Sequence, residues 1–423
     1  MKTTITRCRI PAAIFALAAL FTACTVENHA PVPPPSEMTV TGDYELHKGD
    51  ALGTLTLTGT ALCNGETVPG ALAWKDPETT YDKAGLHDAA WVFTPVDKTR
   101  NAGAEGTVAV FCLPDVYTCG HELADGKRIG RVWKNGEPLY TLASESTSVY
   151  ANSLAVSDGD VYTCGREWIN SANVARVWRN DEPLYTLTDG SQQAYANSLA
   201  VSEGVVYTCG RETINNRGVA QVWRNGDLLY TLTGRNDGAE ARSLAVSEGD
   251  VYTCGYEQIN SVGIAKVWRN GDLLYTLNAE NGDAMATSLA VSEGVVYTCG
   301  YERKGRNIAK VWCNGDLLYT LTDGNNHAEA RSLAVSDGVV YTCGYETING
   351  KDVAKVWRNG EPLYTLTDGN ADAMALSVAV LNGNVYVYGR ETINGIQVSK
   401  VWRNGEPLFT LAGDVSPETL FLD

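Results

Sequence analysis

Charged side chains recur along this chain at matched positions, which is the pattern expected of ion pairs or of a cation site. A glutamate appears once in each of seven similar segments, followed eight or nine residues later by a basic residue or, once, by glutamine. The pairs are Glu122–Arg131, Glu167–Arg176, Glu212–Gln221, Glu257–Lys266, Glu302–Lys310, Glu346–Lys355 and Glu391–Lys400. We predict one cross-strand ion pair per segment. A ring of carboxylates that binds a cation is the alternative.

Cysteine is the second recurring group with possible chemistry. Six cysteines occupy one repeated position, which Tyr388 fills in the last segment: Cys119, Cys164, Cys209, Cys254, Cys299 and Cys343. Equivalent positions in neighbouring repeats lie too far apart for a disulfide, and a metal needs ligands that converge on one point. We therefore predict buried, free thiols that act as apolar filler, and no metal site. Whether Cys63 and Cys112 pair stays open.

Catalytic motifs are not found in the sequence. The five histidines occupy unrelated positions, and no His-Glu-x-x-His, phosphate-binding loop or Gly-x-Ser-x-Gly occurs. We therefore predict no catalytic residues and no cofactor, and expect a non-enzymatic protein. An enzyme that acts on glycans or envelope polymers is kept as the alternative.

Seven tryptophans show the repeat that must position these groups. Trp133, Trp178, Trp223, Trp268, Trp312, Trp357 and Trp402 are 44 or 45 residues apart. In the sixth repeat, runs rich in Val, Tyr, Leu and Thr at 332–336, 339–346, 353–358 and 362–366 predict four strands. Asp337-Gly338 and Asn359-Gly360 predict two-residue hairpin turns. We interpret each tryptophan as packing between sheets.

Four-stranded repeats of this length are typical of β-propeller blades. We predict an all-β fold in which residues 115–423 form a seven-bladed β-propeller. The first repeat lacks its first strand, and residues 418–423 resemble that strand in the other repeats. We predict that the C-terminus supplies it, so that no sheet edge is left open at the seam; residues 107–111 are the alternative donor.

Positions where the repeats disagree are the candidates for ligand binding. One matched position before the first strand reads Tyr150, Tyr195, Glu240, Met285, Glu329 and Met374, and Trp168 replaces a threonine after the second strand. We place these residues in loops on one face of the propeller, and variable loops on a rigid scaffold commonly bind ligands. Neutral drift of exposed loops explains the variation equally simply.

The N-terminus carries a targeting segment. Lys2, Arg7 and Arg9 precede an apolar run at 10–21, and the run ends in Phe21-Thr22-Ala23-Cys24. This ending resembles the lipobox of bacterial lipoproteins, which implies that residues 1–24 are a signal peptide and that Cys24 carries lipid. Ordinary secretion is the alternative. The proline-rich segment 25–37 predicts an extended tether.

Residues 38–114 differ from the repeats, with strand candidates at 52–57, 68–74, 91–93 and 107–111. Val68-Pro69-Gly70, Trp74 and the Trp91-Val92-Phe93 segment resemble bacterial Ig-like modules. The resemblance implies a small Ig-like β-sandwich that acts as a spacer or adhesive module.

The formal charge of −17 argues against a nucleic-acid partner, because basic groups supply most of that affinity. Together these features resemble bacterial envelope lipoproteins with an Ig-like domain before a propeller. We predict a cell-envelope protein, anchored by lipid at the outer membrane or cell surface, with the periplasmic side possible. Its partners are the membrane, through the lipid, and a protein or carbohydrate ligand. A scaffold subunit of an envelope complex is a further alternative.

Overall fold

The computed structural model describes residues 32–144, 148–234, 238–277, 283–411 and 415–423. The predicted signal peptide, Cys24 and most of the predicted tether lie outside these residues. The chain divides after Asp115 into two compact units, and each is described by itself. Within the described ranges the structure is all-β with one short 3₁₀ turn, and no helix there is long and apolar enough to cross a membrane.

The N-terminal unit contains two sheets. The first has the order β1 (Glu37–Val40), β3 (Gly59–Cys63), β4 (Glu66–Thr67). The second has the order β2 (Glu45–His47), β7 (Ala104–Leu113), β6 (Gly85–Pro95), β5 (Gly70–Trp74). Apolar side chains from both sheets, including Ala61, Trp91 and Phe93, pack together as a core. Cys63 and Cys112 are free thiols.

The strand predicted at 52–57 is wrong. Leu52–Thr54 form a 3₁₀ turn, η1, in which Leu52 is buried in the core. The backbone N–H of Gly53 donates to the carbonyl of Pro77 at 2.7 Å. A Cβ atom on residue 53 would lie 3.2 Å from Pro77. Glycine therefore permits the close approach of these two chain segments, and the segment forms a turn instead of a strand.

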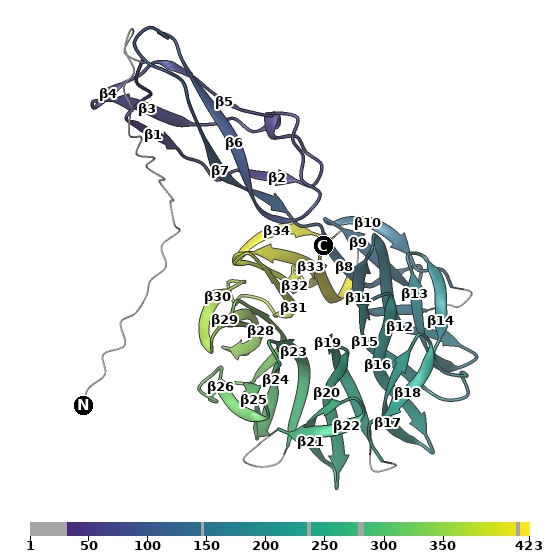
Figure 1. The fold of residues 1–423 in the computed structure, drawn as a ribbon. Helices are drawn as coiled ribbons and strands as arrows, with labels where there is room; N and C mark the ends of the chain where they lie inside the picture. Colours follow the sequence, from purple (N-terminus) through teal and green to yellow (C-terminus); the bar gives the residue numbers. More distant parts are fainter. Residues whose placement is uncertain (1–31, 145–147, 235–237, 278–282, 412–414) are drawn as a thin grey trace. The chain divides into compact units, whose positions relative to one another are not determined.

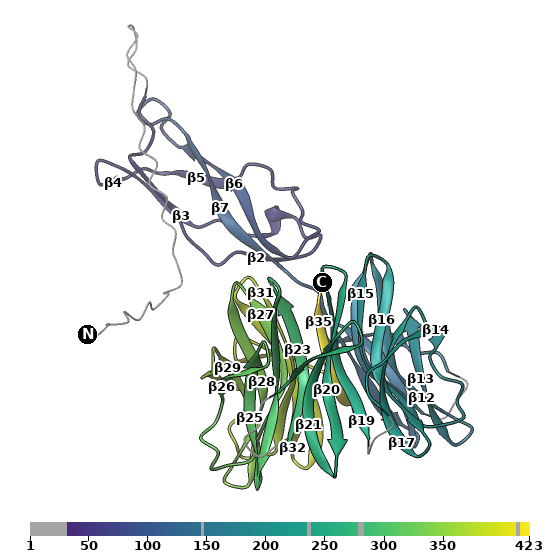
Figure 2. The same cartoon turned by 60° about the horizontal axis from the view of Figure 1, so that its bottom comes forward.

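The C-terminal unit consists of seven four-stranded antiparallel sheets, counted within the described residues. Figures 1 and 2 show these sheets arranged around a common axis. The innermost strands are β11 (Val149–Ser157), β15 (Ala194–Ser202), β19 (Ala239–Ser247), β23 (Ala284–Ser292), β27 (Ala328–Ser336), β31 (Ala373–Leu381) and β35 (Val415–Leu422). The second strands are β8 (Val116–Ala124), β12 (Asp160–Ile169), β16 (Val205–Ile214), β20 (Asp250–Ile259), β24 (Val295–Lys304), β28 (Val339–Ile348) and β32 (Asn384–Ile393).

The two outer positions complete each sheet. The third strands are β9 (Lys127–Lys134), β13 (Ala172–Arg179), β17 (Arg217–Arg224), β21 (Val262–Arg269), β25 (Arg306–Cys313), β29 (Lys351–Arg358) and β33 (Ile396–Arg403). The outermost strands are β10 (Glu137–Thr141), β14 (Glu182–Thr186), β18 (Asp227–Thr231), β22 (Asp272–Thr276), β26 (Asp316–Thr320), β30 (Glu361–Thr365) and β34 (Glu406–Thr410). The four strands predicted for the sixth repeat are confirmed, although most of them are longer than predicted.

The tight turns follow the predicted chemistry. Asp337 and Gly338 have φ of 51° and 71°, and Asn359 and Gly360 have φ of 49° and 85°. Such positive φ values are what a two-residue hairpin of this type requires. Asn359 has a second function, because its side-chain oxygen accepts the backbone N–H of Val340 at 2.9 Å. This explains why asparagine recurs at that turn.

Packing between neighbouring sheets explains the repeated tryptophan and cysteine. Cys164 and Val177 of one sheet form a single buried cluster with Leu199 and Trp223 of the next. All seven repeated tryptophans are almost fully buried, which confirms the packing interpretation. Burial also raises the pKa of the repeated thiols, to about 12 for Cys299. These cysteines are therefore protonated, apolar filler, as predicted.

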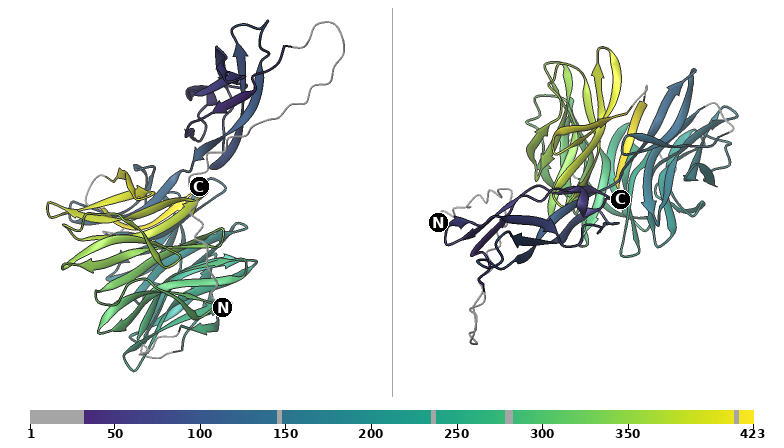
Figure 3. Two further views of the ribbon diagram at one scale, coloured as in Figure 1. Left: turned by 90° about the vertical axis from the view of Figure 1, so that its left-hand side faces the viewer. Right: turned by 90° about the horizontal axis from the view of Figure 1, so that it is seen from above.

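The ring closes through the C-terminal strand. β35 pairs antiparallel with β8, with Thr419 opposite Cys119, and Figure 3 shows the yellow strand against the blue strands of the first sheet. Residues 107–111, the alternative donor, lie in β7 and pair with β6 instead. The predicted closure is confirmed.

Candidate functional site: the axial channel

A β-bulge in each innermost strand turns one side chain toward the axis. The pairing of β11 with β12 slips between Ala151 and Ser153, so that Asn152 has no partner across the strand. Bulges re-aim side chains in this way. The bulged residues of the seven sheets, here called the bulge tier, are Asn152, Asn197, Arg242, Thr287, Arg331, Leu376 and Glu418.

The residue after each bulge is nearly constant and has a structural function. The hydroxyl of Ser153 accepts the backbone N–H of Leu199 in the next sheet at 3.4 Å. The hydroxyl of Ser377 accepts the N–H of Leu420 at 3.1 Å in the same way across the seam. These bonds join neighbouring innermost strands. The bulge tier is therefore held by a regular framework while its own side chains differ.

The bulge tier lines a cavity of about 330 Å³ on the axis. Its walls are polar and carry four charged side chains: Arg166, Arg242, Arg331 and Glu418. Asn152 and Asn197 use their amide N–H groups within the wall, donating at 2.8 Å to the carbonyls of Ala196 and Ala241.

A second layer of variable residues, here called the mouth tier, lies two positions before the bulge. In each sheet one residue of the innermost strand lies opposite one residue of the second strand, and both belong to this tier. The pairs are Tyr150–Arg166, Tyr195–Arg211, Glu240–Tyr256, Met285–Tyr301, Glu329–Tyr345, Met374–Arg390 and Ser416–His121. Six of these residues are predicted ligand-binding candidates. Their placement in loops was wrong, because the innermost strands begin earlier than predicted and the residues lie within them.

Trp168 is also on a strand rather than in a loop. It lies on β12 opposite Asn173, and its side chain is 40% exposed. The turn at Asn170-Ser171 is only two residues long, so both strands continue up to it. Arg166 lies over the rings of both Tyr150 and Tyr195. The ring of Tyr150 also packs against His121, with 4.8 Å between the ring centres.

Tyrosine and arginine alternate across the second and third sheets of the mouth tier. The Arg166 guanidinium lies 3.8 Å from the ring centre of Tyr150 and 5.1 Å from that of Tyr195. Arg211 lies 4.4 Å from the ring centre of Tyr195. A cation over the face of an aromatic ring is attracted to that ring. The result is a ladder of rings and guanidinium groups, of which Arg166 lines the cavity.

Glu240 of the fourth sheet is held by side chains of the third and fourth sheets. Its carboxylate accepts hydrogen bonds from the amide of Asn197 at 2.9 Å and from the hydroxyl of Tyr256 at 3.3 Å. Arg242 of the bulge tier lies 3.5 Å from it, and Arg211 lies 3.9 Å away. Tyr256 has a raised pKa, first because it is buried and second because Glu240 is negative.

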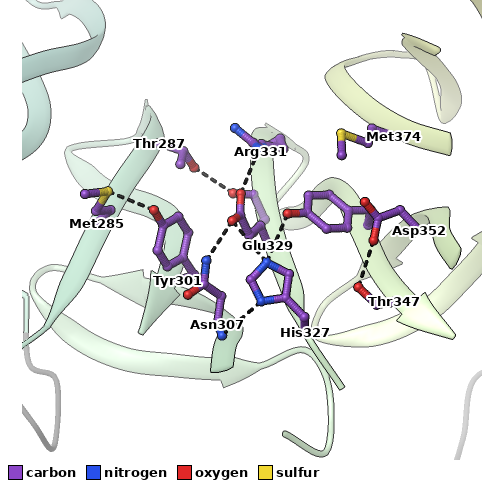
Figure 4. Close-up of polar contacts among 12 residues, drawn as sticks. Met285, Thr287, Tyr301, Asn307, His327, Glu329, Arg331, Thr347, Asp352 and Met374 are labelled. Carbon is purple, nitrogen blue, oxygen red and sulfur yellow. Dashed lines mark hydrogen bonds and ion pairs between the residues drawn. The ribbon is translucent and has the colours of Figure 1, made fainter. Parts of the chain in front are cut away.

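Glu329 forms the corresponding cluster in the sixth sheet (Figure 4). It is almost buried, accepts the Asn307 amide at 2.7 Å, and pairs with Arg331 at 2.8 Å. His327 Nε2 lies 3.5 Å from Glu329 and 3.3 Å from the hydroxyl of Tyr345. Burial and the charge of Glu329 raise the pKa of Tyr345, which keeps its hydroxyl protonated as a donor.

The two methionines of the mouth tier contact polar groups. The hydroxyl of Tyr301 donates to the sulfur of Met285 at 2.8 Å, as drawn in Figure 4. The Arg390 guanidinium donates to the sulfur of Met374 at 3.5 Å. Both methionine sulfurs therefore accept hydrogen bonds and add polarisable, apolar surface to the mouth tier.

Glu418 is the titratable group of the channel. Its side chain is open to the channel, yet the surrounding walls desolvate it and raise its pKa to about 7. The positive charges of Arg166, Arg390 and Arg331 oppose this shift. Glu418 is therefore partly protonated near neutral pH.

The repeated glutamates serve the sheets and not the channel. Six of them form the predicted cross-strand ion pair, for example Lys310 with Glu302 at 2.8 Å. Glu346 lies opposite Val353, as the hairpin geometry predicted. In the third sheet Gln221 takes the place of the cation, and burial raises the pKa of its partner Glu212. Within the described ranges no cluster of three or more acidic, histidine or cysteine side chains is suited to a metal.

The sequence interpretation missed the bulge tier and the arginines that face it. The signal is present in the segment Ala-x-Ser-Leu-Ala-Val, in which five repeats differ only at the second residue. It was overlooked because an isolated variable position inside a strand resembles a solvent-facing residue. Only the bulge directs it toward the axis.

Comparisons with known proteins do not identify a family for this chain. No protein-family model and no curated protein matches the chain. Among solved structures, a glycosyl hydrolase from Bacteroides ovatus matches 65% of this chain and 88% of its own, at 10% identity and a TM-score of 0.32. The structure of RS223-Beta-xylosidase matches 64% of this chain and 96% of its own, at 11% identity and a TM-score of 0.30. Likeness at this level indicates neither activity nor substrate.

Proposed function

We propose that this chain is a cell-envelope lipoprotein whose C-terminal unit is a seven-bladed β-propeller that binds a glycan at the mouth of its axial channel. The observation that carries the proposal is the bulge tier. The repeats keep the residues on either side of the bulge and differ at the bulge itself. Seven equal repeats would give a symmetric ring, whereas a ring of different side chains suits a ligand without that symmetry.

The chemistry of the channel favours a glycan over a protein ligand. The cavity of about 330 Å³ is at the small end of ligand sites. The amide oxygens of Asn152 and Asn197 and the channel carboxylates accept hydrogen bonds, and the arginines donate them. Sugar hydroxyls both donate and accept. The rings of Tyr150 and Tyr195 offer flat apolar faces beside these groups.

The N-terminal part suits a protein held away from a membrane. The lipobox-like ending at Cys24 and the proline-rich segment support a lipid anchor and a tether. The two packed sheets before Asp115 support the Ig-like spacer. In this proposal residues 38–114 are the spacer, residues 115–423 are the propeller, and the protein stays at the outer membrane or cell surface.

A glycan array followed by calorimetry tests the binding function. The double variant Tyr150→Ala/Tyr195→Ala removes the ladder, and we expect affinity for the selected glycan to fall about tenfold or more. The matched control is Tyr162→Ala/Tyr207→Ala, which removes the same residue type from the same two sheets, beside Arg179 and Arg224 at the other end of the strands. Equal losses in both variants, or no glycan bound by the unmodified protein, would contradict the proposal.

A glycan-cleaving enzyme is the second candidate, because Glu418 lines the cavity and two further carboxylates, Glu240 and Glu329, lie in the mouth tier. Glycosidases use a pair of carboxyl groups, and the acid of the pair has a raised pKa. The pKa of about 7 at Glu418 meets that requirement. Release of reducing ends from a bound glycan, abolished by Glu418→Gln without loss of binding, would establish this function instead.

A further inference from the structure

Positive charge exceeds negative charge at the axial channel, although the chain as a whole has a formal charge of −17. The two tiers contain five arginines, Arg166, Arg211, Arg242, Arg331 and Arg390, and three glutamates, Glu240, Glu329 and Glu418. The excess is two positive charges. In an acidic protein such a local reversal marks a place where an anion is attracted.

The charges in excess lie on one side of the channel. Arg242 and Arg331 are neutralised by Glu240 and Glu329. Arg166 and Arg390 form no ion pair with any described carboxylate. Arg166 lies over two tyrosine rings, and Arg390 donates to the sulfur of Met374 and to the side-chain oxygen of Gln397.

Glu418 lies between these two arginines in the ring. It belongs to the sheet of β8 and β35, whose neighbours carry Arg166 on β12 and Arg390 on β32. Both guanidinium groups act electrostatically on its carboxyl group. Glu418 is open to the cavity, which Arg166 also lines. This side of the channel therefore combines two cations that form no ion pair and a carboxyl group that can donate a hydrogen bond when it is protonated.

We infer that the channel binds an acidic sugar, with the sugar carboxylate between Arg166 and Arg390 and beside Glu418. The inference rests on the proposed glycan function and specifies its ligand class. A guanidinium binds a carboxylate through two parallel hydrogen bonds. The remaining hydroxyls of the sugar then meet the asparagine oxygens of the bulge tier and the ring of Tyr150.

Calorimetry with simple probes tests the inference on the purified full-length chain. The probes are glucuronate, the methyl ester of glucuronate, glucose, inorganic sulfate and inorganic phosphate. We expect glucuronate to bind about tenfold or more tightly than its neutral ester, because a hydrogen bond between charged groups has about that effect. The variant Arg166→Gln should abolish this preference. Because Arg166 forms no ion pair with a described carboxylate, we expect this variant to remain folded.

Arg224→Gln is the matched control, because Arg224 also lies over a tyrosine, 5.9 Å from the ring centre of Tyr207, but at the opposite end of its sheet. It should keep the preference for glucuronate. Equal binding of glucuronate, its ester and glucose would overturn the acidic-sugar inference and leave glycan binding intact. Sulfate or phosphate binding as tightly as glucuronate would show an inorganic-anion site and also overturn it. If no sugar binds, both the inference and the proposed function are wrong.

Discussion

Closure of the ring by β35 leads to a quantitative prediction about stability. Leu420 is 7% exposed and packs with Trp133 and Val415 in the cluster at the seam. Replacing a buried leucine by alanine lowers the free energy of unfolding by about 2–5 kcal/mol. We therefore expect Leu420→Ala to lower it by about that amount, even though Leu420 is only three residues from the C-terminus.

The chain offers a matched comparison at the same repeat position. Leu199 is 5% exposed and lies in the innermost strand β15, which the chain enters from β14 of the preceding sheet and leaves to β16 of its own sheet. The backbone N–H of Leu199 donates a hydrogen bond to the hydroxyl of Ser153, and the N–H of Leu420 donates to the hydroxyl of Ser377 in the same way. If β35 is as firmly packed as the other strands, Leu199→Ala and Leu420→Ala should have similar effects.

Urea unfolding followed by tryptophan fluorescence measures both variants, because one buried tryptophan lies in every sheet. Asp423→Ala is the control; it changes an exposed residue after the strand and should alter stability by less than about 0.5 kcal/mol. A large effect at Leu199 together with an effect below about 0.5 kcal/mol at Leu420 would show that the C-terminal strand is not packed in solution. The ring would then be open, contrary to our reasoning.

Three further predictions concern the anchor, an ion pair and the channel. Cys24→Ser should release the protein from membranes into the soluble fraction, and persistence in the membrane fraction would exclude lipid at this cysteine. Lys310→Met should lower the free energy of unfolding by about 3 kcal/mol, the low end for a broken buried pair, because it removes the nearer cation of the fully buried carboxylate of Glu302 and leaves Lys304 at 3.7 Å. Lys400→Met, in a pair with more exposed side chains, should have a smaller effect, and equal effects would refute burial as the cause. The pKa of Glu418 is higher in the folded chain, about 7, than its ordinary 4.5, so its contribution to stability is present at low pH and is lost as the pH rises through about 7. The unfolding midpoints at pH 5 and pH 8 should differ less in Glu418→Gln than in the unmodified protein. An unchanged difference would assign the pH effect to the other groups around Glu418. These groups are Arg166, Arg331, Arg390, Cys119 and Tyr388.

Much of the fold follows from local sequence chemistry. The strands are visible because side chains alternate along them, and the turns are visible because Asp-Gly and Asn-Gly tolerate positive φ. The pairing of Glu346 with Lys355 could be derived because a two-residue turn fixes the register of both strands. The closing strand could be identified because one repeat lacked a segment that the C-terminus resembled.

Local patterns failed where a segment is determined by what packs against it. Leu52 reads as part of an apolar strand, but the close approach of Pro77 to Gly53 makes a 3₁₀ turn there. Tyr150 and Glu329 read as loop residues because they vary, although hydrogen bonds to the second strand hold them in regular structure.

The sequence by itself determined the repeat, the strands of each sheet, the turns and the buried packing residues, because all of these depend on neighbours within one or two repeats. Tertiary structure alone decided which variable residues face one another. A bulge changes the direction of a single side chain, and Arg166, Arg390 and Glu418 lie on three different sheets, far apart in the sequence. They meet only because the ring closes, so no local pattern can show that they share one channel.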